Sequence, residues 1–373
     1  MRVLIACGGT AGHIFPGAAL AEELKKYNEH SHIVLVVSGR ARDKEYLEAA
    51  KFFLKGVALE HIISAPLPYT FSWKLIPFGF KLLAALTQSL VIVLRHRPYV
   101  VVGFGGYISF APVCIARILR IPTLIHEQNL IPGRANHYLT RWVKKIATSF
   151  EETKRYFSAA QLENKIVHTG LPLRRDFVLT MDSAGLRHSP QDKEKCTILV
   201  VGGSQGAQAI NALVLESISK MSREQLAKIR VIHLTGKSDY RLVKNQYDKL
   251  ALEHLVYDFF EDMPSVYRIA DLIIGRSGAS TIFEAACFGL PCILIPYPHG
   301  TLHQKENALF LQRRGAALML DEGTARAQDL QKMILELIEN PDARHALSKS
   351  ISSLRVPNAR KNLIDLVYSL RKE

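Results

Sequence analysis

Residues 275–307 read GRSGASTIFEAACFGLPCILIPYPHGTLHQKEN, and the fold class can be worked out from this stretch. A buried strand over 271–275 runs into Arg276 and a turn of small residues. A helix then opens with Glu284 in its first turns, and Pro291 begins a second apolar strand. A strand, a tight turn, a helix and another strand form the repeating unit of a parallel α/β sheet.

The start of this helix suits a phosphorylated ligand. Main-chain N–H groups and the positive end of the helix dipole attract a phosphate there. Arg276 adds a positive charge, and the Glu284 carboxylate is able to accept both hydroxyls of a ribose. Together these features predict a nucleotide diphosphate that carries a sugar. The same residues also fit an ordinary strand-to-helix turn capped by Ser or Thr, so this stretch alone leaves both interpretations open.

The composition is typical of a soluble protein with more than one domain. The chain has 373 residues, of which 48% are hydrophobic and 22% charged, and this length usually gives about two domains. The net charge of +14 suits nucleic acid, an anionic membrane surface or a phosphorylated substrate. Because the basic residues form no long tail and are not interleaved with aromatic residues, we expect no nucleic-acid partner.

The cysteines and the N-terminus indicate a cytoplasmic protein without a metal. The 5 cysteines are scattered and lack the paired spacing of a metal site, so we expect reduced thiols and no metal ligands. The N-terminus enters a strand and a glycine turn at once, without the pattern of a secretory signal. The most apolar region, 82–94, is interrupted by polar residues at 87–89 and is too short to span a membrane.

The first half of the chain has the pattern of a doubly wound α/β domain. A strand over 2–7 leads into the turn GGTAGH at 8–13, a helix that we expect from about residue 16, and a strand over 32–37. The turn lacks the G-x-G-x-x-G spacing of dinucleotide-binding folds, and no acidic residue closes the second strand. Both differences argue against a nicotinamide-dependent dehydrogenase.

Two later strands of this half also end in candidate site residues. A strand over 99–102 ends in GFGGY at 103–107, before a helix over 110–119. A strand over 123–126 is followed by Glu127, Gln128 and Asn129. Ligands of parallel sheets bind at the carboxyl ends of the strands, so these residues are expected to face a ligand.

The same pattern restarts after a polar linker at 181–195. A strand over 197–201 leads into GGSQGA at 202–207 and a helix over 209–221, and a strand over 255–260 precedes a helix over 264–270. We therefore predict an α/β protein with two Rossmann-like doubly wound domains that face each other across a cleft. The expected ranges are 1–180 for the N-terminal domain, 196–345 for the C-terminal domain, and 346–373 for a last helix that packs back on the N-terminal domain.

Seven short blocks of sequence, taken in order, resemble a single enzyme family. The blocks GGTAGH (8–13), GFGGY (103–107) and GGSQGA (202–207) resemble the three glycine loops of the MurG-type N-acetylglucosaminyltransferases. HEQN (126–129), FFEDM (259–263), RSGASTIFE (276–284) and HQKENA (303–308) match further blocks of that family. Ala11 and Leu171 are departures, since the family usually has Gly and often has Asn there. The Ala11 methyl would crowd a close approach only if its φ were positive.

The resemblance implies a glycosyltransferase of the B-type fold with an inverting reaction. N-acetylglucosamine would pass from UDP-N-acetylglucosamine to the muramyl sugar of undecaprenyl-diphosphate-linked lipid I, and the product would be lipid II for peptidoglycan, cell shape and cell division. No cofactor or metal is implied. The protein would be peripheral on the cytoplasmic face of the bacterial inner membrane. Its partners would be the anionic membrane surface and other proteins of cell-wall synthesis and division.

The resemblance assigns the donor to the C-terminal domain. Phe260 would lie against the uracil and Glu284 would accept the ribose hydroxyls. Ser204 would hold a phosphate, with Arg276 or Arg174 nearby. These donors, fixed in advance, would stabilise UDP as it leaves. The remaining donor contacts assigned in this way are Ala279, Ser280, Thr281, Ile282, Phe283, Gln304 and Asn307.

The catalytic candidates lie in the N-terminal domain. His13 is the candidate general base, because an imidazole titrates near neutrality; a helix-capping role fits the same position. Glu127 is either a rival base or the group that orients His13, and the sequence leaves this open. The residues expected to contact the acceptor or the inner side of the donor are Thr10, Ala11, Gly12, Tyr107 and Asn129.

A second set of expectations concerns the membrane and competing functions. The apolar run 69–94, bordered by Lys74, Lys81 and the basic residues at 95–97, would dock on anionic lipid, although an ordinary buried helix has the same pattern. Competing functions are another lipid glycosyltransferase of this fold, such as a diacylglycerol glycosyltransferase, and a UDP-sugar-binding subunit without catalysis. The presence of His13, Glu127 and Gln304 argues against the second.

Overall fold

The computed structural model describes residues 1–50, 54–64, 75–157, 164–183, 195–203, 206–298 and 302–371. The chain forms two compact units, Met1–Arg174 with Val356–Glu373 and Arg175–Arg355. They are called unit 1 and unit 2 below. The sequence predicted that the first domain ends at residue 180, that the second begins at 196, and that the last helix begins at 346. The structure divides the chain after Arg174 and again after Arg355.

Within the described residues, unit 1 contains a 7-stranded sheet in the order β3-β2-β1-β4-β5-β6-β7, and every pair is parallel. The order runs outward in both directions from β1 and β4, as in doubly wound folds. The strands are β1 (Arg2–Ala6), β2 (His32–Ser38), β3 (Ala58–Ile62), β4 (Val100–Gly103), β5 (Thr123–Glu127), β6 (Lys145–Thr148) and β7 (Ile166–His168).

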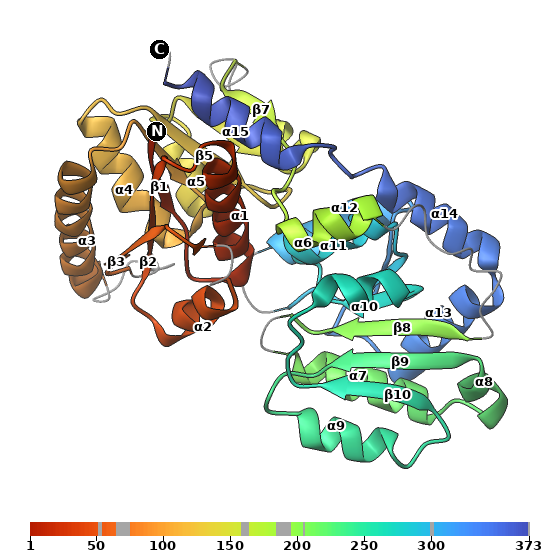
Figure 1. Ribbon diagram of the computed structural model, residues 1–373. Helices are drawn as coiled ribbons and strands as arrows, with labels where there is room; N and C mark the ends of the chain where they lie inside the picture. Colours follow the sequence, from red (N-terminus) through yellow and green to blue (C-terminus); the bar gives the residue numbers. More distant parts are fainter. Residues whose placement is uncertain are drawn as a thin grey trace. The chain divides into compact units, whose positions relative to one another are not determined.

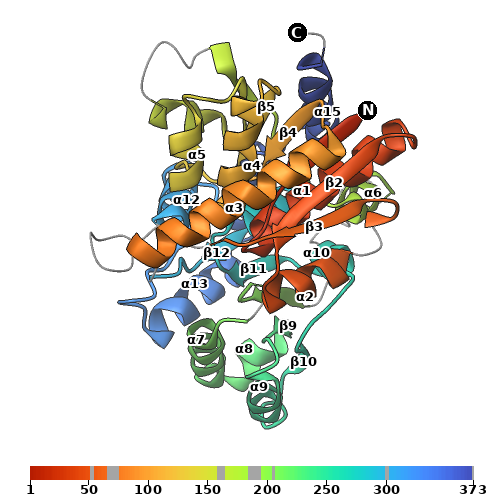
Figure 2. The same ribbon diagram turned by 90° about the vertical axis from the view of Figure 1, so that its left-hand side faces the viewer.

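Helices cover both faces of this sheet (Figures 1 and 2). Successive residues of β1 point to opposite faces. Val3 and Ile5 therefore pack with α1, α2 and α15, whereas Leu4 and Ala6 pack with α3 and α4. Burial on both faces explains why the strands are continuously apolar. The helices are α1 (Ala11–Tyr27), α2 (Ala41–Ala50), α3 (Leu75–His96), α4 (Gly106–Ile118), α5 (Arg134–Leu139) and α15 (Ala359–Ser369), with a 3-10 helix over Glu151–Tyr156.

Two helices begin earlier than the sequence predicted. Helix α1 starts at Ala11 and α4 at Gly106, with Pro16 and Pro112 inside them. Proline prefers the first helical position, which favours a start of α1 at Pro16, as the sequence predicted. Ile14 is fully buried, so packing of the first turn outweighs that preference. As a consequence, His13 lies in the first turn of α1.

Helix α15 is joined to α1 by a buried ion pair. The Arg360 guanidinium, with 8% of its side chain exposed, lies 2.7 Å from a Glu22 carboxylate oxygen and 2.8 Å from a Glu23 oxygen. Leu363 and Val367 of α15 are fully buried in the core that α1 shares with β1 and β2. The C-terminal helix therefore completes the core of unit 1.

Unit 2 contains, in its described part, a 6-stranded parallel sheet in the order β10-β9-β8-β11-β12-β13. Its strands are β8 (Cys196–Val201), β9 (Ile229–Leu234), β10 (Glu253–Tyr257), β11 (Leu272–Gly275), β12 (Cys292–Leu294) and β13 (Leu318–Met319). Its helices are α6 (Arg175–Ser183), α7 (Gln208–Ser219), α8 (Arg223–Ala227), α9 (Tyr240–Tyr247), α10 (Met263–Ile269), α11 (Ala279–Phe288), α12 (His303–Arg313), α13 (Ala327–Glu339) and α14 (Pro341–Ser352).

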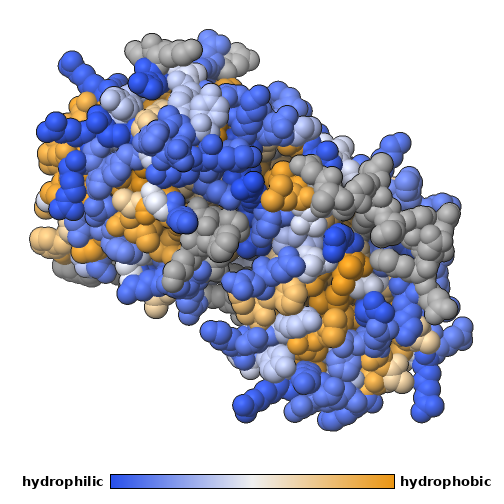
Figure 3. Space-filling model, in the orientation of Figure 1, coloured by the Kyte–Doolittle hydropathy of each residue, from blue (hydrophilic) through white to orange (hydrophobic). Residues whose placement is uncertain are grey.

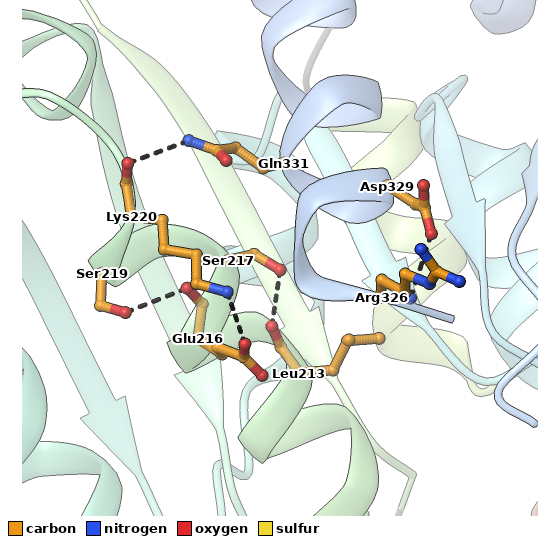
Figure 4. Close-up of polar contacts among 8 residues, drawn as sticks. All are labelled: Leu213, Glu216, Ser217, Ser219, Lys220, Arg326, Asp329 and Gln331. Carbon is orange, nitrogen blue, oxygen red and sulfur yellow. Dashed lines mark hydrogen bonds and ion pairs between the residues drawn. The ribbon is translucent and has the colours of Figure 1, made fainter. Parts of the chain in front are cut away.

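Helix α7, which follows the third glycine loop, is supported from α13. The Gln331 side chain of α13 donates a hydrogen bond of 3.2 Å to the main-chain oxygen of Lys220, just past the end of α7 (Figure 4). Val214 of α7 and Leu330 and Ile334 of α13 belong to the same buried cluster. These contacts fix the helix whose N-terminus faces the carboxyl edge of the sheet.

The Arg360 ion pair predicts that unit 1 depends on α15. Substitution Arg360→Ala leaves two partly buried carboxylates without their cation, and we expect a loss of about 3 kcal/mol in the free energy of unfolding of unit 1. Hydrogen exchange of α1 amides measures it. Lys361→Ala, at an exposed position of the same helix, is the control. Equal protection in the two variants would contradict this role.

Candidate functional site

The first glycine loop, 8–13, is held by a buried carboxylate. Asp43 of α2 is fully buried and accepts hydrogen bonds from the main-chain N–H groups of Gly9, at 3.0 Å, and Ser38, at 3.2 Å. A Cβ on Gly8 would lie 2.8 Å from an Asp43 oxygen, so the close approach requires glycine. Asp43 therefore sets the path of the loop that leads to His13.

The imidazole of His13 is oriented by this loop. Its Nδ1 lies 3.1 Å from the main-chain oxygen of Gly8 and 3.0 Å from Thr10 Oγ1. A carbonyl oxygen only accepts, so the hydrogen-bond network assigns the proton to Nδ1. The neutral ring then carries its lone pair on Nε2. A neutral His13 with its proton on Nδ1 would accept a proton through Nε2.

The second glycine loop, 103–107, packs against the same ring. Gly105 and Gly106 have φ values of 83° and 67°. A Cβ on Gly105 would lie 3.4 Å from His13 Nε2 and 3.3 Å from Asn136 Nδ2, and one on Gly106 would lie 3.3 Å from His13 Nδ1. Both positions favour glycine for its conformation and for its lack of a side chain. The structure therefore brings the first two loops together around His13.

Glu127, at the end of β5, is 1% exposed and accepts hydrogen bonds from residues that follow it in the loop and in α5. The donors are the main-chain N–H of Gly133 at 2.9 Å, the Asn136 side-chain amide at 2.8 Å and the main-chain N–H of Asn129 at 3.0 Å. These bonds anchor the loop between β5 and α5. Through Asn136, which lies beside Gly105, Glu127 is also connected to the loop around His13.

His126, next to Glu127, is buried inside unit 1. Its Nε2 lies 3.1 Å from the main-chain oxygen of Gly170, and its ring stacks on Phe104 with a centroid distance of 5.2 Å. Burial lowers the pKa of His126 to about 4, so the ring stays neutral near pH 7. Its contacts are those of a structural residue.

The other candidates in unit 1 occupy the carboxyl edge of the sheet or its border. The Ala11 backbone is helical, so its methyl group avoids the strain that a positive φ would cause. The Arg174 guanidinium lies over the Phe15 ring, 5.4 Å from its centroid, at the end of unit 1. The candidates that follow β1, β4 or β5 are Thr10, Ala11, Gly12, Tyr107 and Asn129.

Arg276, which follows β11 in unit 2, is 8% exposed. Its Nη1 donates to the main-chain oxygen of Ile295 at 3.1 Å and forms a close ion pair with Glu322. The guanidinium also lies 5.2 Å from the centroid of the Tyr297 ring. Arg276 is therefore fixed in place. The sequence did not predict its ion pair with Glu322, which brings a negative charge next to the guanidinium.

Helix α11 begins at Ala279 after Gly278, and its first turn contains no acidic side chain. The first-turn N–H groups of a helix lack partners within it, and here its positive end is not neutralised by a local carboxylate. Ser280 and Thr281 are half-buried. Ile282 and Phe283 are buried, so their side chains serve the core of unit 2.

Glu284 lies further along α11 and is half-buried. Its Oε2 accepts a hydrogen bond of 2.9 Å from the hydroxyl of Tyr267, a fully buried residue of α10. Phe260 lies in the loop before α10, because β10 ends at Tyr257 and not at residue 260 as the sequence predicted. The Phe260 and Tyr257 ring centroids are 4.7 Å apart.

The turn before α11 is tied to α12 by neutral groups. The Ser277 hydroxyl donates to the main-chain oxygen of Gln304 at 2.8 Å, and the Asn307 amide donates to the main-chain oxygen of Ser277 at 3.1 Å. The Gln304 side-chain oxygen accepts from the Tyr297 main-chain N–H at 3.0 Å. Gln304 and Asn307 therefore lie next to the start of α11.

One expected phosphate-binding residue, Ser204, lies outside the described residues. In the described part of its loop, a Cβ on Gly206 would lie 2.0 Å from the main-chain oxygen of Thr235, so this turn also requires glycine. Within the described ranges, no group of three or more His, Cys, Asp or Glu side chains is arranged to hold a metal ion.

Sequence reasoning missed four polar residues at these sites: Asp43, Asn136, Tyr267 and Glu322. Each makes a hydrogen bond or ion pair to a candidate residue or its loop. None belongs to the motif blocks, since each lies in a helix or turn that packs on them from elsewhere in the chain. No local sequence signal marks them, since Asp43 lies in the polar helix α2 and Glu322 lies in a turn.

Relatives that match along the whole chain decide the family. The chain is 36% identical over 370 residues to the UDP-N-acetylglucosamine--N-acetylmuramyl-(pentapeptide) pyrophosphoryl-undecaprenol N-acetylglucosamine transferase of Desulfotalea psychrophila, covering 99% of this chain and 96% of that protein. Residues 3–148 match the glycosyltransferase family 28 N-terminal domain, and residues 197–363 match the family's C-terminal domain. The chain belongs to glycosyltransferase family 28.

Further relatives place the chain among the MurG-type members of family 28. The Geobacter sulfurreducens protein of the same name is 36% identical over 375 residues, with 100% of both chains covered. The crystal structure of Acinetobacter baumannii MurG is similar with a TM-score of 0.76 and 26% identity, covering 99% of each chain. The predicted resemblance and the predicted pair of Rossmann-like domains of the glycosyltransferase B type are therefore confirmed.

The buried histidines predict acid sensitivity in this family 28 chain. Burial lowers the pKa of His126 to about 4 and that of His233, in unit 2, to about 3. Unfolding lets each ring take up a proton below about pH 6.5. The free energy of unfolding of each unit is therefore at its full value above that pH. Below it, each histidine lowers the free energy of unfolding of its own unit by about 1.4 kcal/mol per pH unit.

Hydrogen exchange at pH 7.5 and 5.5 measures this effect in each unit. His126→Gln should reduce the pH dependence of unit 1 alone, and His233→Gln that of unit 2 alone. An unchanged pH dependence in both variants would contradict the assignment.

Proposed function

We propose that this chain transfers N-acetylglucosamine from UDP-N-acetylglucosamine to the muramyl sugar of lipid I, with inversion, and so forms lipid II. The supporting observation is the orientation of His13, whose Nδ1 lies 3.1 Å from the Gly8 carbonyl oxygen; a proton on Nδ1 would leave Nε2 to accept a second one. A family 28 enzyme needs such a base to take a proton from the attacking hydroxyl of the acceptor.

In this proposal the donor binds to unit 2. The diphosphate lies at the start of α11, where main-chain N–H groups and Arg276 stabilise the negative charge that develops on departing UDP. Arg276 is held in advance by Ile295 and Glu322, so little reorganisation is needed. Phe260 lies against the uracil, Glu284 accepts the ribose hydroxyls, and Gln304 and Asn307 contact the sugar. Ser204 and the third glycine loop hold a phosphate.

Unit 1 supplies the acceptor side of the reaction. His13 removes the proton from the acceptor hydroxyl as that oxygen attacks the sugar carbon and the bond to UDP breaks. Glu127 acts as an anchor and not as the base, because its oxygens already accept from Gly133, Asn136 and Asn129. Asp43 and the two glycine loops keep the imidazole in place. We expect no metal ion or other cofactor in this chemistry.

Substitution of His13 tests the proposal. His13→Ala should lower kcat by about 10²- to 10⁴-fold, the usual contribution of a general base. UDP binding should be unchanged, because His13 acts on the acceptor hydroxyl and has no proposed contact with UDP. The assay measures UDP release with a lipid I analogue, and His30→Ala, at an exposed histidine of unit 1, is the control. A fall of less than tenfold would exclude His13 as the base.

The same assay distinguishes the competing functions. UDP-glucose and UDP-galactose should be poor donors, and diacylglycerol should be a poor acceptor. Preference for diacylglycerol would favour the alternative lipid glycosyltransferase. No turnover by the isolated chain would favour a binding subunit.

We also propose that α3 lies on the anionic surface of the cytoplasmic membrane. Of the described residues, one segment, Ile76–His96, is long and apolar enough to cross a membrane by length and composition alone. Its inner face is part of the unit 1 core, since Ile92 and Val93 are buried against the sheet. Crossing a membrane would remove that face from the sheet, so we infer a peripheral position.

The outer face of α3 supports this position. It carries exposed apolar side chains at helical spacing, with Phe80 72% and Leu83 61% exposed, and Lys81 and Arg97 are exposed beside them. Hydrophobic residues are visible at the side of the molecule where α3 lies (Figure 3). An apolar stripe bordered by cations is typical of helices that lie in the membrane interface. The aromatic run 69–73 and Lys74, which the sequence also assigned here, lie outside the described residues.

The double variant Phe80→Ser with Leu83→Ser should weaken binding to vesicles that contain anionic lipid. Burying the two side chains in lipid contributes about 3 kcal/mol, so the partition coefficient should fall by about 100-fold. Vesicle co-sedimentation measures it, while UDP affinity should hold. Leu242→Ser, at an equally exposed leucine of unit 2, is the control. Unchanged sedimentation of the double variant would remove α3 from the membrane contact.

A further inference from the structure

The hydroxyl of Tyr267 is aimed at the carboxylate of Glu284. The two oxygens are 2.9 Å apart, and Tyr267 is completely buried. An ionised carboxylate only accepts hydrogen bonds, so the phenol donates. This contact joins α10, which follows the loop of Phe260, to the helix that begins at the expected diphosphate position.

Aromatic packing fixes the ring that carries this hydroxyl. The Tyr267 ring centroid is 5.4 Å from that of Phe177, edge to face at 74°, and 5.9 Å from that of Phe288. Phe177 comes from α6 and is fully buried, and Phe288 comes from α11. Three helices therefore hold a side chain that has only two rotatable bonds, and its oxygen has a defined position.

Glu284 needs such an anchor to bind a diol in one geometry. The last torsion of a glutamate side chain is broad, so a half-buried carboxylate without an anchor rotates. A carboxylate offers about four lone-pair sites. A hydrogen bond to Oε2 restricts the rotation and is compatible with two further hydroxyl donors. Preorganisation of this kind raises affinity for a ligand that uses the fixed geometry.

We propose that Tyr267 is a positioning residue that orients Glu284 toward the vicinal 2′- and 3′-hydroxyls of the donor ribose. The site thereby selects ribonucleotide over 2′-deoxyribonucleotide donors. This inference rests on the proposed function, in which Glu284 accepts the ribose hydroxyls. It adds the group that sets the orientation of that carboxylate and a selectivity that follows from it.

Binding of UDP and 2′-deoxy-UDP by calorimetry tests the inference. Tyr267→Phe keeps the ring and removes only the hydroxyl. We expect UDP to bind about tenfold more weakly and 2′-deoxy-UDP to be nearly unaffected, so the selectivity falls by about tenfold. In turnover, KM for UDP-N-acetylglucosamine should rise while kcat changes by less than about twofold, because the lost contact stabilises the ground state and the transition state equally.

Tyr247→Phe is the matched control. Tyr247 is also fully buried in unit 2, and its hydroxyl lies 3.0 Å from His233 Nδ1. Its removal has a comparable effect on packing and should leave the ratio of the two affinities unchanged. An equal fall in selectivity for both tyrosine variants would overturn the inference, because it would reflect general loosening of unit 2.

A double-mutant cycle with Glu284→Ala separates this inference from the proposed function. If Tyr267 acts through Glu284, Tyr267→Phe has no further effect on the ratio in the Glu284→Ala background. A persisting effect would overturn the positioning role alone. If Tyr267→Phe kept full selectivity while Glu284→Ala lost it, the positioning role of Tyr267 would be overturned and the proposed function would be retained. Unchanged selectivity in Glu284→Ala would overturn both assignments.

Discussion

Buried main-chain N–H groups must find acceptors, and this requirement governs the carboxyl edge of the unit 1 sheet. Glycine makes the loops there but offers no side chain to satisfy them. Asp43 accepts from the Gly9 N–H of the first glycine loop, and Glu127 accepts from the N–H groups of Asn129 and Gly133 in the loop after β5; both carboxylates are almost completely buried. The loops are therefore rigid enough to hold an imidazole against main-chain atoms. The position of the His13 ring therefore depends on a carboxylate, Asp43, that lies outside the glycine loop.

Unit 2 meets the same requirement in a different way. The turn before α11 is tied by Ser277 and Asn307, which are neutral. A carboxylate at that place would repel a diphosphate, because both carry negative charge. The acidic groups nearby are set apart: Glu322 is paired with Arg276, and Glu284 lies beyond the first turn of α11. This distribution of charge suits an anionic ligand at the helix start and a neutral diol one turn further along.

The sequence predicted the central strands β1, β4, β8 and β11, because apolar runs that end in glycine have local causes, whereas β3, β6 and β13 were not predicted. The starts of α1 and α4 were wrong, since burial of residues such as Ile14 outweighed the local preference of proline. The polar stretch after residue 180 suggested a linker, but Phe177 already packs inside unit 2 and the division comes at Arg174. Roles that depend on a distant partner, such as Asp43 on Gly9 or Tyr267 on Glu284, had no local signature. The motif blocks identified the family because each combines several residues in a fixed order.

Unit 1 is discontinuous in the chain, because its core needs α15, which follows unit 2. During translation, Arg175–Arg355 emerges as an uninterrupted segment, whereas the N-terminal segment of unit 1 needs α15, which is made after all of unit 2. The usual N-to-C order of domain folding is therefore reversed for completion of the native state. Until α15 has been made, the apolar face of α1 that it covers in the native core lacks its partner.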